Sequence, residues 1–205
     1  MPEPRFARDE HQRIEAARPL SSEEVFEVVR RNGEEELERP GVSLAWSGLA
    51  AGMAMGFSVI AEASLHARLP ADNDWASVVA DAGYTLGFIV VVMSRLQLFT
   101  ENTVTPVMPM CWKPSMWQFT RLLRIWGIVL STNLLGAILF AAFVMKTGAT
   151  SEEVRHEIMA LGRHAADGNF IDTVTKGIGA GFLIAAMTWI IAGAASSRLL
   201  IVGII

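Results

Sequence analysis

Residues 93–109, "MSRLQLFTENTVTPVMP", interrupt a part of the chain that is otherwise apolar. The stretch carries two charged residues, Arg95 and Glu101, and it contains two prolines. A charge in the middle of a bilayer costs about 2.5–3.5 kcal/mol on insertion scales, and such residues usually face a cavity or a partner. Prolines remove backbone donors and break helices. The stretch therefore predicts two half-helices separated by a loop, with the second half-helix opening near residues 99–102.

Three long segments around this stretch contain no Asp, Glu, Lys, Arg or His: residues 41–61, 125–145 and 177–197. About 20 apolar residues cross the core of a bilayer as an α-helix, so each segment predicts a membrane span. A fourth span lies between residues 82 and 110, with the polar stretch in its middle. Since 52% of the residues are hydrophobic and only 19% are charged, we expect an all-α integral membrane protein rather than a soluble domain.

The last residues, "LLIVGII" at 199–205, begin a fifth apolar segment. A span that stopped there would leave unpaired carbonyls in hydrocarbon. We therefore expect four full spans plus the start of a fifth, and a C-terminally truncated chain whose complete form continues for about two further spans.

The first 40 residues are polar and mixed in charge, and we expect residues 1–40 to form a cytoplasmic arm ahead of a transmembrane domain at residues 41–205. Lysine and arginine are more frequent on the side of the N-terminus than on the opposite side, which fits the positive-inside bias. The expected topology is therefore a multi-pass protein with a cytoplasmic N-terminus.

Two amphipathic helices are predicted outside the spans. In the arm, Ser21 and Glu24 have the spacing of a capping box, and Gly33 and Pro40 bracket the end of the helix. This helix either lies along the membrane face or acts as a regulatory plug. On the opposite side, Thr150 begins a second, short surface helix.

Glycines recur every four residues in the first span, at Gly48, Gly52 and Gly56, which permits close contact with a neighbouring helix. The letters "GLAAGM" at 48–53 are similar to "GIGAGF" at 177–182. This similarity suggests that the first and fourth spans correspond in two repeats. Repeats of three spans each are inverted in the membrane, an architecture typical of transporters.

An enzyme is not expected, because the sequence offers no nucleophile beside a base, no phosphate loop and no metal-ligand cluster at a usable spacing. His156 and His164 stand among acidic residues, but on a surface helix they are interpreted as solvated charge. The single cysteine, Cys111, is interpreted as a packing residue. The net charge of −4 argues against a nucleic-acid partner. No catalytic residue, metal or cofactor is therefore predicted.

The motif "LQLFTENTVTP" at 96–106 resembles the LFTGN signature of the formate/nitrite transporter family, and is most similar to the subgroup with LFTEN. The resemblance extends over nearly all of residues 41–205. It includes "GYTLGF" at 83–88, "NLLGA" at 133–137 and "FIDTVTKGIGAGF" at 170–182. It implies an aquaporin-like fold of inverted repeats, assembled as a homopentamer in the bacterial inner (plasma) membrane. Each protomer would hold its own pore for small monovalent anions.

The resemblance also implies roles for single residues. Thr100 matches a threonine whose hydroxyl faces the centre of the pore, and Gly87 matches a glycine that precedes a bulky constriction residue. The implied pore or substrate path consists of Tyr84, Phe88, Leu98, Phe99, Thr100, Glu101 and Asn102. The residues expected at helix packing contacts are Gly48, Gly52, Gly56, Asn133, Gly136, Gly177 and Gly181. The family's central histidine should lie in the fifth span, beyond Ile205, so no proton relay is assigned.

Glu101 departs from the family pattern, because an ionised carboxylate beside the lumen repels formate or nitrite. Three interpretations remain open: a structural ion pair with Arg95, a protonatable gate, or altered selectivity. Three functions also remain open. The first is a passive or proton-coupled channel for small monovalent anions across the lipid bilayer. The second is the same fold passing a neutral solute or a cation. The third is a truncated subunit that does not transport.

Overall fold

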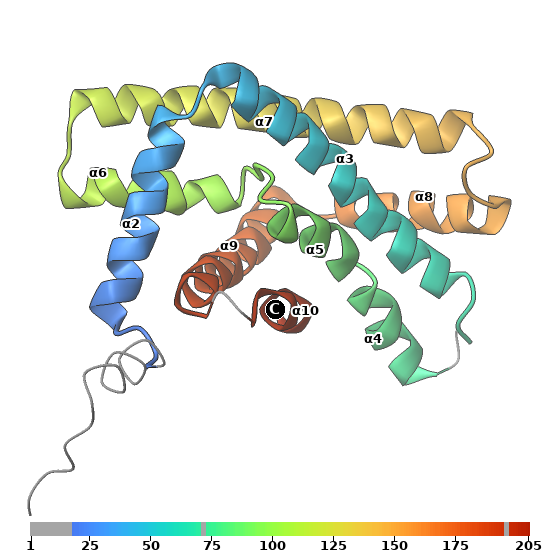
Figure 1. The fold of residues 1–205 in the computed structure, drawn as a ribbon. Coiled ribbons are helices and arrows are strands. Elements are labelled where there is room, and N and C mark those ends of the chain that lie inside the picture. Colours follow the sequence, from blue (N-terminus) through green and yellow to red (C-terminus); the bar gives the residue numbers. More distant parts are fainter. Residues whose placement is uncertain (1–17, 71–72, 195–196) are drawn as a thin grey trace, which may run out of the picture.

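The computed structural model describes residues 18–70, 73–194 and 197–205, and every regular element in them is helical. Figure 1 shows their arrangement. The elements are α2 (Ser22–Glu38), α3 (Gly41–His66), α4 (Asp74–Ala82), α5 (Thr85–Met93), the 3₁₀ turns η1 (Glu101–Thr103) and η2 (Thr105–Val107), α6 (Met108–Trp112), α7 (Met116–Lys146), α8 (Glu152–Ala166), α9 (Phe170–Gly193) and α10 (Arg198–Ile204).

Four helical segments among the described residues are long and apolar enough to cross a membrane. They are Gly41–His66, Trp75–Met93, Met116–Lys146 and Phe170–Gly193. The second begins earlier than expected, because α4 and α5 together supply the length that we assigned to residues 82–110. The fourth also begins and ends earlier than the uncharged segment 177–197, since Asp172 and Lys176 are accommodated in its first turns. The expected all-α membrane protein with four spans is confirmed.

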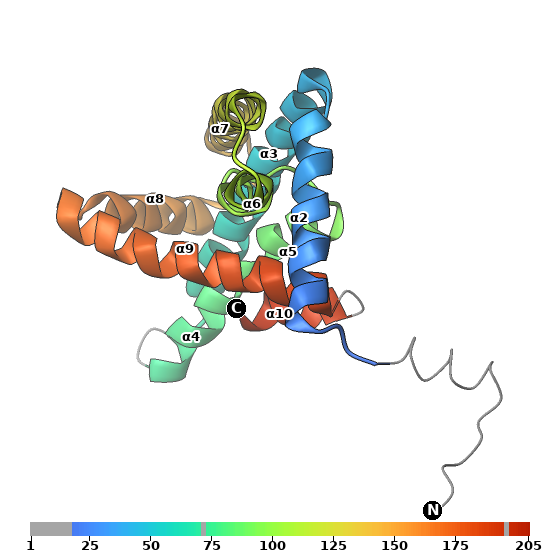
Figure 2. The same ribbon diagram turned by 90° about the vertical axis from the view of Figure 1, so that its left-hand side faces the viewer.

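The first helix, α2, begins with the predicted capping box. The hydroxyl of Ser21 accepts a hydrogen bond from the backbone N–H of Glu24, whose carboxylate accepts one from the backbone N–H of Ser21. The helix α2 ends at Glu38, between Gly33 and Pro40 as predicted, so Gly33 does not itself end the helix. Gly33 instead serves a close contact, since a Cβ there would overlap with the carbonyl oxygen of Thr105. The helix therefore lies directly against the broken span, as Figure 2 shows.

The end of α2 is held by α7. One guanidinium nitrogen of Arg124 donates hydrogen bonds to the carbonyl oxygens of Leu37 (3.2 Å) and Arg39 (2.7 Å). These carbonyls have no partner within the helix, so the contact satisfies them and fixes the turn into α3.

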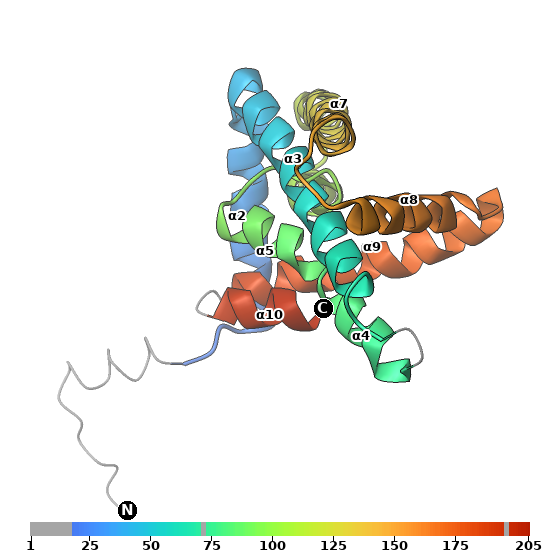
Figure 3. The same cartoon turned by 90° about the vertical axis from the view of Figure 1, so that its right-hand side faces the viewer.

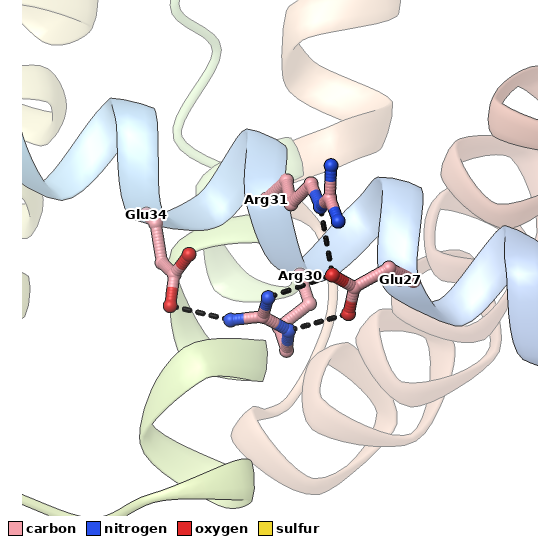
Figure 4. A network of polar contacts seen from close by, with 4 residues as sticks. All are labelled: Glu27, Arg30, Arg31 and Glu34. Atoms are coloured by element: carbon pink, nitrogen blue, oxygen red, sulfur yellow. Dashed lines mark hydrogen bonds and ion pairs between the residues drawn. The ribbon is translucent and has the colours of Figure 1, made fainter.

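An exposed network of charges runs along α2 (Figure 4). The guanidinium of Arg30 bonds to the carboxylates of Glu27 and Glu34, and that of Arg31 also bonds to Glu27. The hydrogen bonds from Arg30 and Arg31 lower the pKa of Glu27 from its ordinary value of 4.5 to about 2.

The central contact of the fold joins α3 to α7, which cross closely in Figure 1. A Cβ at Gly48 would overlap with Thr132, one at Gly52 with the backbone of Asn133, and one at Gly56 with the ring of Phe140. From the other helix, a Cβ at Gly136 would overlap with the carbonyl oxygen of Leu49. The glycines therefore allow the two backbones to touch, which is how helices pack in lipid.

The short helix α8 confirms the surface helix predicted after residue 147, with one correction. Its N-cap is Ser151, whose hydroxyl accepts the N–H of Val154, rather than Thr150. The neighbouring helix α9 differs from α3 in its glycines. Nothing among the described residues lies within 4 Å of a Cβ placed at Gly177 or Gly181. The structure thus gives these two glycines no packing contact within the described part of the chain.

Candidate functional site in the broken span

The chain breaks within the predicted stretch, but this stretch follows the apolar segment Trp75–Met93 rather than lying in its middle, and the second half-helix begins later than the predicted residues 99–102. The helix α5 ends at Met93, and α-helix resumes only at Met108, after two 3₁₀ turns that start at Glu101. Arg95 lies at the turn with a φ of 51°. A non-glycine residue in this left-handed region costs about 1–3 kcal/mol and persists only where the surroundings impose it. The surroundings here are the side chains of α3 and α7.

One side chain of α7 holds most of the loop. The amide of Asn133 donates from Nδ2 to the carbonyl oxygens of Gly48 (2.8 Å) and Gln97 (2.9 Å). Its Oδ1 accepts the backbone N–H of Phe99 at 2.8 Å. One amide therefore satisfies two loop groups and ties the loop to α3. Non-helical backbone at membrane depth requires such partners, because lipid supplies none.

Four further side chains complete this frame. The hydroxyl of Ser47 accepts the backbone N–H of Gln97 at 3.0 Å, and the indole of Trp126 donates to the carbonyl of Asn102 at 2.9 Å. The side chains of Gln97 and Asn102 bond to each other and are both buried. Sequence reasoning missed Ser47, Gln97 and Trp126, because serine and tryptophan within an apolar helix give no signal of a partner far along the chain.

The LFTEN letters divide into two groups. Leu98 packs against the buried residues of α3 and α5, and the ring of Phe99 packs against Trp126 with centroids 6.3 Å apart. Asn102 is 3% exposed. By contrast, Thr100 is exposed and Glu101 is half-buried. The side chains of Leu98, Phe99 and Asn102 therefore belong to the packed frame of the loop, whereas those of Thr100 and Glu101 remain at least partly accessible.

A cavity of about 290 Å³ lies beside the loop, between α2, the broken span, α9 and the start of α10. Figures 1 and 2 show these elements gathered around the break. Its charged lining comprises three carboxylates and two guanidiniums: Glu35, Glu36, Glu101, Arg95 and Arg198. Thr105 and Arg198 contribute a hydroxyl and an Nε that are buried without a hydrogen-bond partner among the described residues. Unpaired buried donors are costly, so the cavity suits a polar or anionic occupant.

The expected ion pair between Arg95 and Glu101 is not present. Both residues line the cavity, but none of the ion pairs among the described residues joins them. The charged groups that act on Glu101 are Glu36 of α2 and Arg198 of α10. The left-handed turn at Arg95 changes the direction of the chain between the two, which a spacing argument could not include.

Tyr84 and Phe88 lie on the other half of the broken span. Their rings face each other with centroids 5.9 Å apart. The hydroxyl of Ser58 on α3 donates to the carbonyl of Tyr84 and accepts the N–H of Gly87 at 2.9 Å. A Cβ at Gly87 would overlap with that hydroxyl, so this glycine allows α5 to approach α3. The two aromatic residues are brought together, and their place in a pore stays a prediction.

One group of residues offers ligand atoms for a metal ion that no spacing in the sequence indicated. Glu62, His66 and Asp81 each offer one ligand atom, and these atoms lie within 4.8 Å of one another. Glu62 and His66 are one turn apart on α3, but Asp81 comes from α4. Only the pairing of the two helices reveals the group, so a search for short spacings could not find it.

The chain is similar to known proteins over most of its length. The chain matches the family model described as formate/nitrite transporter over residues 23–205. It is 35% identical over 184 residues to the inner membrane protein YfdC of Escherichia coli (strain K12), which covers 90% of this chain and 59% of that protein. It is 24% identical over 197 residues to the uncharacterized transporter YrhG of Bacillus subtilis (strain 168), which covers 89% of this chain and 69% of that protein. The chain thus spans less than two thirds of the E. coli relative.

Proposed function

The chain belongs to the formate/nitrite transporter family, and from this premise we propose that it carries small monovalent anions across a bacterial inner membrane. The observation that carries the proposal is the frame around the broken span. Ser47, Trp126 and Asn133 satisfy the loop backbone, so Thr100 and Glu101 are free to face a solute. Polar backbone at membrane depth is tolerated where it is buried in protein or lines a water-filled path.

The cavity supplies a reason for an anion. Arg95 and Arg198 line it, and the hydroxyl of Thr105 is a buried donor that has no partner among the described residues. An unscreened carboxylate 4 Å from a passing anion would repel it by about 4 kcal/mol at an effective dielectric constant of 20. We propose that the two guanidiniums offset this repulsion from Glu101.

A second candidate rests on the same lining. Its three carboxylates outnumber its two guanidiniums, so the described lining has a net charge of −3 + 2 = −1 when all five groups are ionised. This balance favours a cation or a neutral solute over an anion. Glu101 is the residue that distinguishes the two candidates, because it belongs to the motif and faces the cavity.

The test is solute flux in proteoliposomes that contain the chain. We expect uptake of formate or nitrite, and we expect Glu101→Gln to raise that uptake or to shift its pH dependence. Glu38→Gln is the matched control, because Glu38 is exposed on α2 and does not line the cavity. Uptake of ammonium or glycerol without formate would favour the second candidate. An unchanged profile in Glu101→Gln would remove the role of this residue in gating or selectivity.

We also propose a cytoplasmic N-terminus and a homopentameric assembly. Cys111 provides a direct test of orientation, because it is the only cysteine of the chain and is exposed at the end of α6. A membrane-impermeant maleimide should fail to label it in intact cells and should label it in inverted vesicles. Chemical cross-linking of the purified chain should give a ladder that ends at five copies. Labelling from outside, or a ladder that ends earlier, would contradict these two proposals.

A further inference from the structure

The group formed by Glu62, His66 and Asp81 joins the C-terminal part of α3 to α4, and Figure 3 shows these two helices beside each other. The His66 Nε2 and Asp81 Oδ1 atoms are 3.7 Å apart. We propose that these three side chains bind a divalent transition-metal ion, and that Zn²⁺ is the appropriate probe.

The composition of the group supports a cation. Glu62 and Asp81 place two carboxylates close together, and none of the ion pairs among the described residues joins either of them to a lysine or arginine. The nearby Arg68 donates instead to the carbonyl of Ser64. A divalent ion would neutralise both carboxylates at once. The imidazole favours zinc or a similar transition metal over magnesium and calcium, which prefer oxygen ligands alone.

The geometry of the group is close to that of a bound ion. Zinc takes nitrogen and oxygen ligands at about 2.0–2.2 Å, which places two ligands of a tetrahedral site about 3.4 Å apart. The present separations, of up to 4.8 Å, require only a small closure by rotation of the side chains. Three protein ligands leave a position for water, as in open zinc sites.

The backbone around the group is fixed. Ser58 lies one turn before Glu62 on the same face of α3, and its hydroxyl bonds to the backbone of Tyr84 and Gly87. Two residues after Asp81, a Cβ at Gly83 would lie 2.9 Å from the side chain of Leu65. Both contacts hold α3 against the α4–α5 segment, so the ligands come from two helices whose relative position does not change freely.

An ion bound to this group would change the charge next to Tyr84 and Phe88. Asp81 is one turn before Tyr84, whose ring faces Phe88. A divalent ion held there would neutralise the negative charge of the two carboxylates beside these rings. We expect this change of charge to alter the flux of solute past Tyr84 and Phe88. That expectation rests on the proposed function, whereas binding of the ion does not.

The first experiment measures binding without any transport. The chelator-treated chain, in a Cys111→Ser background and with a tag that contains no histidine, is titrated with ZnCl₂ by calorimetry. We expect one ion per chain, and at least tenfold weaker binding in His66→Ala, since loss of an outer-shell partner alone costs about 10–100-fold. Glu62→Gln and Asp81→Asn should weaken binding similarly, and a hundredfold excess of Mg²⁺ should not displace the zinc.

The matched control replaces His156 and His164 by alanine, because these histidines lie on α8, outside the group. His66→Gln serves as a second variant if His66→Ala lowers the yield of folded protein. Absence of saturable binding, or binding lost in the α8 control and kept in His66→Ala, would overturn the proposal.

The second experiment adds ZnCl₂ outside proteoliposomes. We expect formate uptake to fall in the unmodified chain and to stay unchanged in His66→Ala. Absence of any uptake together with stoichiometric zinc binding would reject the proposed transport while leaving the metal site in place. Uptake that zinc does not alter, despite binding, would reject the effect of the ion on the path.

Discussion

The helices α3 and α9 begin from similar glycine patterns and end in opposite environments. In α3, a Cβ at Gly52 would overlap with the backbone of Asn133 on α7. In α9, a Cβ at Gly181 would meet nothing within 4 Å among the described residues. Similar letters therefore do not imply similar contacts. What distinguishes the two helices is the neighbour α7, which packs closely against the glycines of α3 and also donates a hydrogen bond from the amide of Asn133 to α3.

The largest expected effect comes from removing that amide. Asn133→Ala removes the partner of the N–H of Phe99 and of the carbonyl of Gln97, and it removes the additional hydrogen bond to the carbonyl of Gly48 in α3. Each unsatisfied buried group costs about 1–3 kcal/mol, so we expect a loss of several kcal/mol in detergent together with loss of solute uptake. Thermal unfolding checks this. The adjacent Ser131→Ala is the control, because its hydroxyl bonds only within α7. Equal stability of the two variants would mean that the loop does not depend on α7.

The next largest effect is expected from replacing glycine by alanine in α3 and in α9, which tests the comparison of the two helices directly. Alanine raises helix propensity over glycine by about 1 kcal/mol at either position, so the two substitutions differ only in what surrounds them. Gly52→Ala should destabilise the chain by about 1–3 kcal/mol, since α3 and α7 must separate. Gly181→Ala should leave stability unchanged or raise it slightly. Paired melting curves measure both. Destabilisation by Gly181→Ala would show that α9 has a partner outside the described part of this chain.

Loosening the contact of α2 with the broken span should have an effect of intermediate size. Gly33→Ala would push α2 away from Thr105 and Pro109, but the gain in helix propensity offsets part of the cost. We expect a net loss of about 1 kcal/mol and faster tryptic cleavage after Arg30 and Arg31, while the four spans stay folded. Unchanged cleavage would indicate that α2 does not depend on this contact.

The smallest effect concerns the exposed charges of α2. Because Arg30 and Arg31 hold the pKa of Glu27 at about 2, its carboxylate stabilises α2 fully above its ordinary pKa of 4.5. This contribution is lost as pH falls from 4.5 towards 2. Peptic cleavage of α2 should become slightly faster over that range, and Glu27→Gln should remove the pH dependence. A change of equal size in the four spans would show that the titration acts elsewhere.

Much of the fold and part of the site follow from the sequence. The lengths of the apolar segments predict the four spans, and a charged stretch with two prolines predicts the break after Met93. Gly33 and Pro40 bracket the end of α2 as predicted, but the close contact that Gly33 permits with Thr105 could not be predicted. The frame at Ser47 and Trp126 and the group around Asp81 could not be predicted, since each joins residues that only the packing of helices brings together.

The two residues of the motif whose side chains do not fix the loop, Thr100 and Glu101, are suited to mutagenesis. In the described part of the chain, the side chains of Thr100 and Glu101 donate or accept none of the hydrogen bonds that fix the loop, which come from the backbone and from Ser47, Trp126 and Asn133. Positions 100 and 101 can therefore be randomised together in a library without unfolding the scaffold. Growth selection on different carbon or nitrogen sources would then sort the variants by the solute they admit.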